Sequence, residues 1–230
     1  THLVVTASDF LVTASRDGQL KFWKKQQTGV DFVKHFRAHL APISGLSATP
    51  DGALLATSAA DKGLKVFDVQ SFDMIHWLKL DYTPSVCEWI GSSSASRKLL
   101  ACADAEQPLI RIYDGEGGGS APLRELRIHA SPVLHIKRNA RCGSVISIDS
   151  RGVIEYWSDE GDFGTPQGLA FRFKTETSLY ELAKCKATPT SLSVSPDGTH
   201  FAVTSSDAKV RLFRYATGKT RRTYDESFDA

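Results

Sequence analysis

Histidines and carboxylates are the residues in this sequence whose types could support acid–base chemistry. The seven histidines, at positions 2, 35, 39, 76, 129, 135 and 200, are scattered along the 230 residues. No H-E-x-x-H zinc motif, G-x-S-x-G nucleophile motif or Walker phosphate loop occurs. His39 and Asp61 could act as an acid–base pair if the fold brought them together. The sequence therefore offers one candidate pair and no catalytic motif.

Cysteines and clustered acids are the other residues that could hold a cofactor or metal. Cys87, Cys102, Cys142 and Cys185 never occur at C-x-x-C spacing, so a zinc site is not expected. Cys87 and Cys102 lie in apolar runs, which predicts reduced, buried thiols in a cytosolic or nuclear protein. The acidic stretch 159–162 lacks the spacing of a calcium loop and is interpreted as a solvated turn. We therefore predict no cofactor and no metal.

Basic residues gather near the end of the chain, although the net charge of the whole sequence is only +2. Six of them lie between Lys209 and Arg222, with no acidic residue among them. One interpretation is an edge that contacts RNA phosphates or an acidic partner. The other is a solvated outer face beside Asp225 and Glu226. Both interpretations stay open from the sequence.

An internal repeat supplies the elements that must position these side chains. Five times, a short apolar run leads through a polar turn into an alternating run that ends in an aromatic residue. These closing aromatics are Trp23, Phe67, Tyr113, Trp157 and Phe213, and they lie 44, 46, 44 and 56 residues apart. A period near 40–45 residues with four strands per unit is typical of WD40 β-propellers.

The repeat predicts an all-β fold with about five four-stranded antiparallel blades. We assign one partial propeller domain to 1–230, with blades at about 1–38, 39–81, 82–129, 130–186 and 187–226, and expect further blades outside the segment, giving seven in total. A closed ring of five blades is the alternative. Fourth strands are expected at 31–36, 74–80, 123–128, 170–174 and 221–224. Residues 158–186 break the period, and 177–184 suit a short helix or an ordered loop. Residues 115–120 suit a flexible connector.

In WD repeats, a loop His, a Ser or Thr, a turn Asp and a Trp form a buried hydrogen-bonded set. Asp17, Asp61 and Asp207 lie six residues before their closing aromatics, where a carboxylate can tie the turn shut. His39 is well placed to pair with Asp61. His129 precedes the fourth unit, where Arg151 stands at the turn position, and the third unit has Gln107 there. We expect no unit to hold the complete set, and we favour a structural brace over catalysis for His39 and Asp61.

Partner contacts are expected at the turns between second and third strands, because propellers commonly bind on that face. Arg16 and Arg151 lie in such turns, and arginine is enriched among residues that dominate binding energy. On the basic edge, Lys209, Arg211 and Arg214 are further candidates. We predict protein partners at these five positions.

Several stretches are more specific than the repeat itself. They are Val33-Lys-His-Phe-Arg-Ala-His39, Lys65-Val-Phe-Asp-Val-Gln-Ser-Phe-Asp-Met-Ile75, Cys87-Glu-Trp-Ile90, Ile154-Glu-Tyr-Trp157, Leu179-Tyr-Glu-Leu-Ala-Lys-Cys-Lys-Ala187 and Lys209-Val-Arg-Leu-Phe-Arg214. From about Val5 to Ser227 the chain resembles the peptidylprolyl isomerase domain and WD repeat-containing proteins, which are cyclophilins with an N-terminal propeller. The resemblance implies a nuclear, spliceosome-associated protein whose catalytic domain lies further along the parent chain. None of that domain's active-site motif occurs here, so no catalytic residue is transferred.

These observations lead to a hypothesis and two alternatives. The hypothesis is a protein-interaction platform, without enzymatic activity of its own, that docks a nuclear cyclophilin-type isomerase on the spliceosome. The alternatives are a chromatin reader that binds a histone tail and an RNA-contacting module that uses 209–222. No apolar run reaches the roughly 18 residues of a membrane span, and the first residues do not resemble a signal peptide, so no membrane partner is expected.

Overall fold

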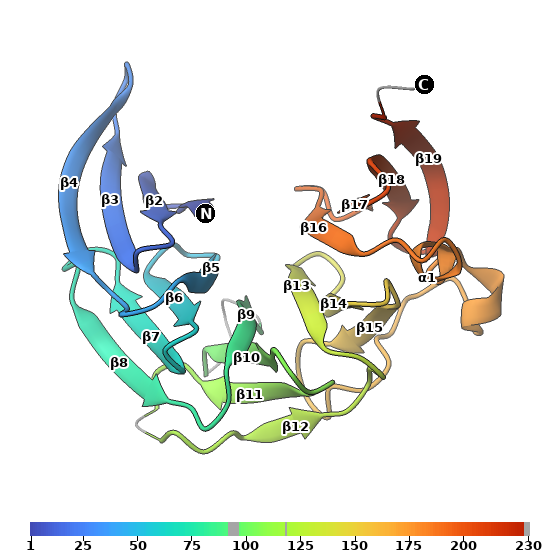
Figure 1. Ribbon diagram of the computed structural model, residues 1–230, viewed down its shortest axis with the longest axis horizontal. Coiled ribbons are helices and arrows are strands. Elements are labelled where there is room, and N and C mark those ends of the chain that lie inside the picture. The colour runs from blue at the N-terminus through green and yellow to red at the C-terminus, as the bar shows by residue number, and fades with distance from the viewer. Residues whose placement is uncertain (92–96, 118, 228–230) are drawn as a thin grey trace. The chain divides into compact units, whose positions relative to one another are not determined.

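The computed structural model describes residues 1–91, 97–117 and 119–227, and its regular structure is almost entirely β-strand (Figure 1). Gly118, within the predicted connector 115–120, lies outside the described residues. Five antiparallel sheets follow one another along the chain, and within each sheet neighbouring strands are consecutive in sequence. The chain divides into two compact units, Thr1–Glu106 with Ile110–Glu125, and Gln107–Leu109 with Leu126–Ala230. The predicted all-β repeat architecture is therefore present.

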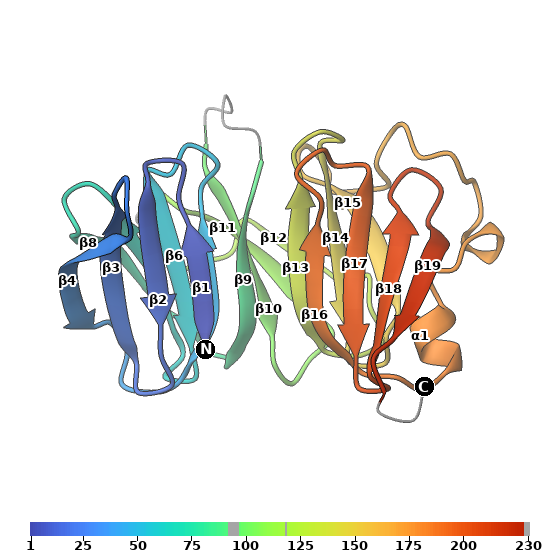
Figure 2. The same cartoon turned by 90° about the horizontal axis from the view of Figure 1, so that it is seen from above.

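The first unit contains three four-stranded sheets, with only the last residue of β12 assigned to the second unit (Figure 2). The first sheet consists of β1 (His2–Val5), β2 (Phe10–Ala14), β3 (Gln19–Lys25) and β4 (Val30–Arg37). The second consists of β5 (Ile43–Ala48), β6 (Leu54–Ala59), β7 (Gly63–Asp68) and β8 (Met74–Lys79). The third consists of β9 (Pro84–Ile90), β10 (Leu99–Asp104), β11 (Ile110–Asp114) and β12 (Arg124–Leu126).

Apolar side chains on facing strands bury one another between the sheets of the first unit. Val12 on β2 lies opposite Phe22 on β3, and both are fully buried in a cluster that also contains Leu55 and Phe67 of the second sheet. Burial of such side chains contributes roughly 1.5–3 kcal/mol each. Because the first two sheets cover one another in this way, they are held together chiefly by contacts between neighbouring modules.

The Pro-Asp-Gly turn before β6 links the first two sheets. Gly52 has φ of +70°, and a Cβ at this position would meet backbone nitrogens of Ala7 and Ser8 at 2.8 Å. The Asp51 carboxylate accepts from Ala53 N at 3.0 Å, and Ser8 Oγ donates to Gly52 O at 3.0 Å. Glycine is required here because the turn needs both a positive φ and a close backbone approach.

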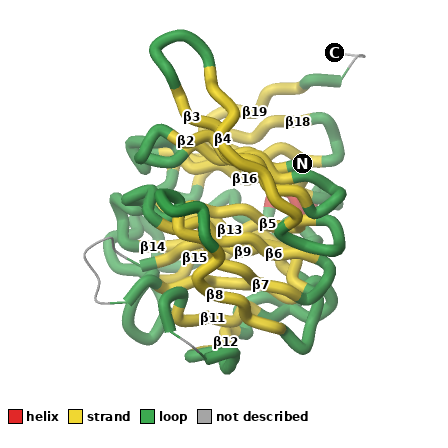
Figure 3. The backbone as a smooth tube through the Cα atoms, turned by 90° about the vertical axis from the view of Figure 1, so that its left-hand side faces the viewer, coloured by secondary structure: helices red, strands yellow, loops and turns green. Residues whose placement is uncertain are grey.

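The second unit contains two sheets, whose strands are yellow in Figure 3, and a helical segment that lies between the two sheets in the sequence. One sheet consists of β13 (Val133–Asn139), β14 (Ser144–Asp149) and β15 (Ile154–Ser158). The other consists of β16 (Pro189–Val194), β17 (His200–Ser205), β18 (Lys209–Arg214) and β19 (Lys219–Asp225). A 3₁₀ turn, η1 (Lys174–Glu176), and a short helix, α1 (Glu181–Lys184), lie between β15 and β16.

The fourth strand predicted at 170–174 is wrong, since the fourth sheet has three strands among the described residues. The backbone N–H of Ala170 donates instead to Ala216 O in the turn between β18 and β19, at 2.8 Å. The ring of Phe171 packs edge-on against Tyr156, with centroids 5.7 Å apart. The alternating sequence of this segment reflects packing of a loop on the unit's core rather than strand pairing.

Candidate functional site

His39, the first half of the candidate acid–base pair, lies in the link between β4 and β5 and is 1% exposed. Its Nδ1 lies 3.0 Å from Asp61 Oδ1, and its Nε2 lies 2.8 Å from Thr57 Oγ1. Because the carboxylate can only accept, Nδ1–H donates to Asp61, and the Thr57 hydroxyl donates to Nε2. The expected pair is therefore present, with a hydroxyl as its third member.

The electrostatics of this set favour a neutral imidazole beside an ionised carboxylate. Burial lowers the pKa of His39, although Asp61 opposes the shift. Burial alone would raise the pKa of Asp61, but hydrogen bonds from Leu40 N at 3.0 Å, from His39 and from Gly63 N at 3.1 Å lower it. An imidazole enclosed in this way cannot contact a substrate, so the set closes the turn between β6 and β7.

A second imidazole set lies in the fourth sheet. His129 Nε2 is 2.7 Å from Ser147 Oγ, and Trp157 Nε1 donates to the same oxygen at 3.1 Å. Asp149 places Oδ2 3.4 Å from His129 Nδ1, an ion-pair distance without hydrogen-bond geometry. All four residue types meet here, with the acid supplied by Asp149 at the end of β14, two residues before Arg151. The hydrogen-bonded set is still incomplete, as expected, because His129 Nδ1 makes no hydrogen bond to any described residue.

In the first and third sheets, other polar contacts take the place of the histidine–aspartate sets. Asp17 is exposed and accepts from Gln19 N at 3.0 Å, while Trp23 Nε1 donates to Thr13 Oγ1 at 3.2 Å. In the third sheet, Arg111 donates to Asp104 at 3.1 Å, and its guanidinium lies over the ring of Tyr82. The hydroxyls of Tyr113 and Tyr82 lie 3.2 Å apart. A strand-end acid, rather than Gln107, completes the third unit.

Arg211 on β18 holds the turn of the fifth sheet. It is 2% exposed and donates to Asp207 Oδ2 at 2.5 Å and to Glu181 Oε1 of α1 at 3.3 Å. The Arg211 hydrogen bonds hold the pKa of Asp207 far below its usual range. The prediction that Arg211 contacts a partner is contradicted by this burial, because its donors are directed into the protein.

The other predicted contact residues lie at the surface. Arg16, Arg151 and Arg214 are exposed, whereas Lys209 is half-buried and pairs with Asp225 at 3.3 Å. Arg151 also borders a recess of about 470 Å³ that includes Val153, Ala183 and Lys186. Three of the five predicted contact positions are thus accessible to a macromolecule.

The basic edge is smaller than the sequence suggests. Like Arg211 and Lys209, two further cations of this edge have partners within the chain. Arg221 donates to His200 Nε2 at 3.0 Å, and the guanidinium of Arg222 lies 4.7 Å from the centre of the Tyr224 ring. The exposed cations of this edge are Arg214, Lys219, Arg221 and Arg222.

Cys87 and Cys102 are buried, Cys142 and Cys185 are exposed, and all four are free thiols in the structure. Within the described residues, no group of three or more His, Cys, Asp or Glu side chains is arranged to hold a metal ion. No helix in the described part of the chain is long and apolar enough to span a membrane.

Sequence reasoning missed three acids, Asp104, Asp149 and Glu181, that take part in the polar sets. Asp104 and Asp149 each end the apolar run of a second strand, and that position is the signal that could have found them. Glu181 lies in the segment that breaks the repeat, where the spacing of the repeat does not predict which residues align with the other units.

Comparison with known proteins agrees with this arrangement. The family model described as WD domain, G-beta repeat matches residues 2–24, 30–68 and 177–214. Peptidylprolyl isomerase domain and WD repeat-containing protein 1 of Homo sapiens is 46% identical over 229 residues, which are 99% of this chain and 35% of that protein. Over nearly its whole length the chain is therefore similar to part of the peptidylprolyl isomerase domain and WD repeat-containing proteins.

Other similar proteins extend the match beyond animals. A peptidyl-prolyl cis-trans isomerase of Arabidopsis thaliana is 40% identical over 227 residues, 99% of this chain and 36% of that protein. One from Rhizopus delemar is 46% identical over 233 residues, 100% of this chain and 37% of that protein. The chain therefore spans about a third of the relatives it matches, and the part that it matches is their WD repeat region.

Proposed function

We propose that this chain is the protein-binding platform of a nuclear peptidyl-prolyl isomerase and docks that enzyme on the splicing machinery. The observation that carries the proposal is that the polar side-chain sets stabilise the fold and are not open to a substrate. His39 and His129 are enclosed at strand ends, and Arg211 is directed into the protein. Rigid sheets with exposed turns provide binding surfaces, and WD40 propellers commonly bind proteins.

Isomerase activity, in this proposal, belongs to another part of the parent protein. The relatives are named isomerases, and the chain corresponds to a third of their length. The WD repeats would then raise the local concentration of the isomerase at proline-containing segments of the assembly to which they bind.

A histone tail and RNA are the alternative partners. Arg214, Lys219, Arg221 and Arg222 are exposed and could contact phosphates. Since Lys209 is paired with Asp225 and Arg211 is buried, fewer cations are available than the six in the sequence. This reduction favours a protein partner over RNA.

Affinity purification of the tagged protein from nuclear extract, carried out with and without ribonuclease, tests the proposal. We expect splicing proteins to be enriched at least tenfold over an unrelated tagged WD40 protein. Recovery of histones in place of splicing proteins would instead support the chromatin alternative. Loss of the splicing proteins after ribonuclease treatment would show that RNA bridges the association.

A further inference from the structure

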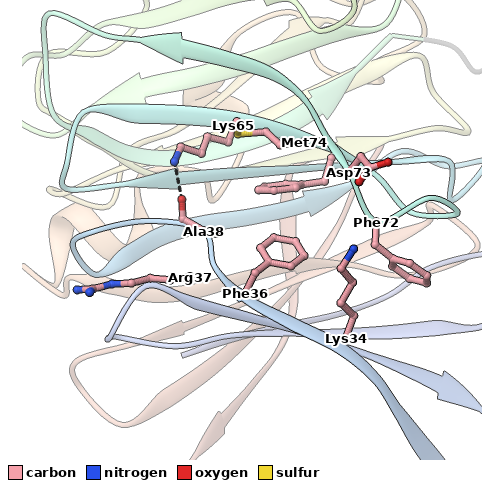
Figure 4. Close-up of a pocket in the computed structure, with 9 residues that line it drawn as sticks. Lys34, Phe36, Arg37, Ala38, Lys65, Phe72, Asp73 and Met74 are labelled. Carbon is pink, nitrogen blue, oxygen red and sulfur yellow. Dashed lines mark hydrogen bonds between the residues drawn. The ribbon is translucent and has the colours of Figure 1, made fainter.

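A groove with a volume of about 360 Å³ opens between β4 and the β7–β8 hairpin of the first unit (Figure 4). Both of its walls lie in one compact unit, and both come from stretches that carry the family resemblance, 33–39 and 65–75. Its volume falls within the roughly 300–1,000 Å³ typical of ligand pockets. None of the polar sets described above reaches this groove.

Aromatic rings form the floor of the groove. Phe36 packs against Phe67 with centroids 5.2 Å apart, and Phe72 packs edge-on against Phe10 and Phe22 at 5.4 and 5.2 Å. Phe72 has φ of +61°, a conformation that is unfavourable for a bulky side chain. Packing against two rings compensates for this backbone strain and fixes the Phe72 ring at the groove. The floor is thus a preformed aromatic surface.

Large apolar side chains continue along the β8 rim. Trp77 is 61% exposed and Met74 is 47% exposed, and they lie opposite Lys65 and Phe67 of β7, which line the groove. Single exposed apolar residues are ordinary, but two of them beside an aromatic groove are typical of an interaction site. β4 also ends its sheet, so its outer edge is available for pairing with an extended chain.

Positive charge surrounds this apolar surface. Lys34, Arg37 and Lys65 line the groove, and Asp73 is the one acid among its lining residues. Lys34 extends between Phe36 and Phe72 (Figure 4). The Lys65 amine donates to Ala38 O at 2.6 Å and lies 4.9 Å from the centre of the Trp77 ring, which leaves ammonium hydrogens for a further acceptor.

We propose that this groove binds an extended segment of a partner protein in which a large apolar side chain is flanked by carboxylates. The apolar side chain packs on the partly exposed rings of Phe36 and Phe72, above the buried ring of Phe67, and the carboxylates pair with Lys34, Arg37 and Lys65. A second copy of the chain would bring the same three cations against one another, so charge complementarity favours a distinct, acidic partner. This inference rests on the proposed protein-binding function and names the chemistry of its partner.

Fluorescence anisotropy with the purified protein and three labelled peptides tests the groove directly. The first peptide has a Leu-Leu-Phe core flanked by glutamates, the second has the same core flanked by lysines, and the third has glutamates around a serine core. We expect the first to bind at least tenfold more tightly than either of the others and to weaken as salt is raised. Equal affinities for the first peptide and either of the others would overturn the proposal.

Matched variants locate the binding on the surface. Lys34→Glu and Met74→Glu should each weaken binding of the first peptide at least fivefold, since both side chains are exposed and the fold does not depend on them. The controls are Lys25→Glu, an exposed cation outside the groove, and Leu123→Glu, whose apolar side chain is 49% exposed. Unchanged affinity in both groove variants, or equal losses in the controls, would contradict the proposal.

Other occupants of the groove are distinguished in the same experiments. Sedimentation of the protein that shows dimers dissociated by Met74→Glu would assign the groove to a second copy. Tighter binding of a labelled ten-residue oligouridine, weakened by Lys34→Glu, would assign it to RNA. Either result overturns the proposed acidic segment. Failure to recover splicing proteins from nuclear extract with peptide binding intact would instead overturn the proposed docking on the spliceosome alone.

Discussion

The turns of the second and fifth sheets place an aspartate at the same position and give it different partners. Asp61 and Asp207 each lie six residues before the closing aromatic of their unit. Asp61 accepts from the neutral imidazole of His39, whereas Asp207 accepts from the permanently charged guanidinium of Arg211. The repeat therefore fixes where the carboxylate stands, and the neighbouring link or strand determines which donor satisfies it.

The two braces also differ in how far they reach. The His39 set joins a link, a strand and a turn around the second sheet. Arg211 additionally binds Glu181, whose Oε2 accepts from Thr220 on β19 at 2.5 Å, so it connects α1 with two strands. The insertion before β16 is thereby tied to the fifth sheet by charge as well as by apolar packing.

Arg211→Ala is expected to lower the free energy of unfolding more than any other substitution considered. Removing a buried guanidinium leaves Asp207 without its main partner and Glu181 without its ion pair, and such losses cost about 3–5 kcal/mol. Chemical denaturation measures the free energy of unfolding. Arg214→Ala, at an exposed position on the same strand, should change it by less than about 0.5 kcal/mol. Equal effects of the two substitutions would contradict the interior role of Arg211.

Asp61→Ala should have the next largest effect. It leaves His39 Nδ1 and the backbone N–H groups of Leu40 and Gly63 without their acceptor, at a cost of about 2 kcal/mol. The matched control is Asp17→Ala, which removes an exposed carboxylate at the same repeat position and should cost about 0.5 kcal/mol. If both variants unfold at the same denaturant concentration, the buried imidazole adds nothing to the brace.

Glu181→Gln should have a smaller effect, about 1 kcal/mol, because the carboxylate is partly exposed and its pairing with Arg211 is screened by solvent. The double-mutant cycle sharpens this prediction. In the Arg211→Ala background the same substitution should cost less, since its ionic partner is gone. Full additivity of the two losses would show that Glu181 does not act through Arg211.

The smallest expected effect is a difference in pH dependence between the His39–Asp61 set and the Arg211–Asp207 set. Because burial lowers the pKa of His39 below its ordinary value of about 6.5, the unfolded chain takes up a proton that the folded chain resists. The His39 contribution is thus fully present above pH of about 6.5 and is lost as the pH falls below it. The Arg211 brace remains charged throughout this window, since the pKa of Asp207 is lowered.

The difference is measurable as a slope. The free energy of unfolding should fall less steeply between pH 7 and about pH 5 in His39→Gln than in the unchanged protein. Arg211→Ala should leave this slope unaltered. An identical slope in the protein with and without His39 would contradict the neutral, buried imidazole.

The all-β repeat and the pairing of His39 with Asp61 could be predicted because both follow from fixed spacing. The role of Asp149 could not, because the acid comes from the end of β14 rather than from the turn. The burial of Arg211 depends on Glu181, thirty residues away in a segment without repeat register. The strand expected at 170–174 failed because alternation alone cannot distinguish strand pairing from a loop packed on Tyr156.

The aromatic groove could not be predicted from the sequence either. Phe36 and Phe72 have no feature in the sequence that distinguishes them from other repeat residues, and the groove forms only because the two sheets bring them together. Turn chemistry and strand register are local, whereas a binding surface depends on which modules become neighbours.

Crosslinking mass spectrometry of the assembly purified from nuclear extract tests the central claim most directly, because it reports which surfaces of this chain touch other proteins. With a short amine-reactive crosslinker, we predict links from Lys34 and Lys65 to an acidic segment of a splicing protein, and few from Lys25. Links to partner proteins that arise only from the rest of the parent protein, with none from this chain, would contradict its role as a binding platform.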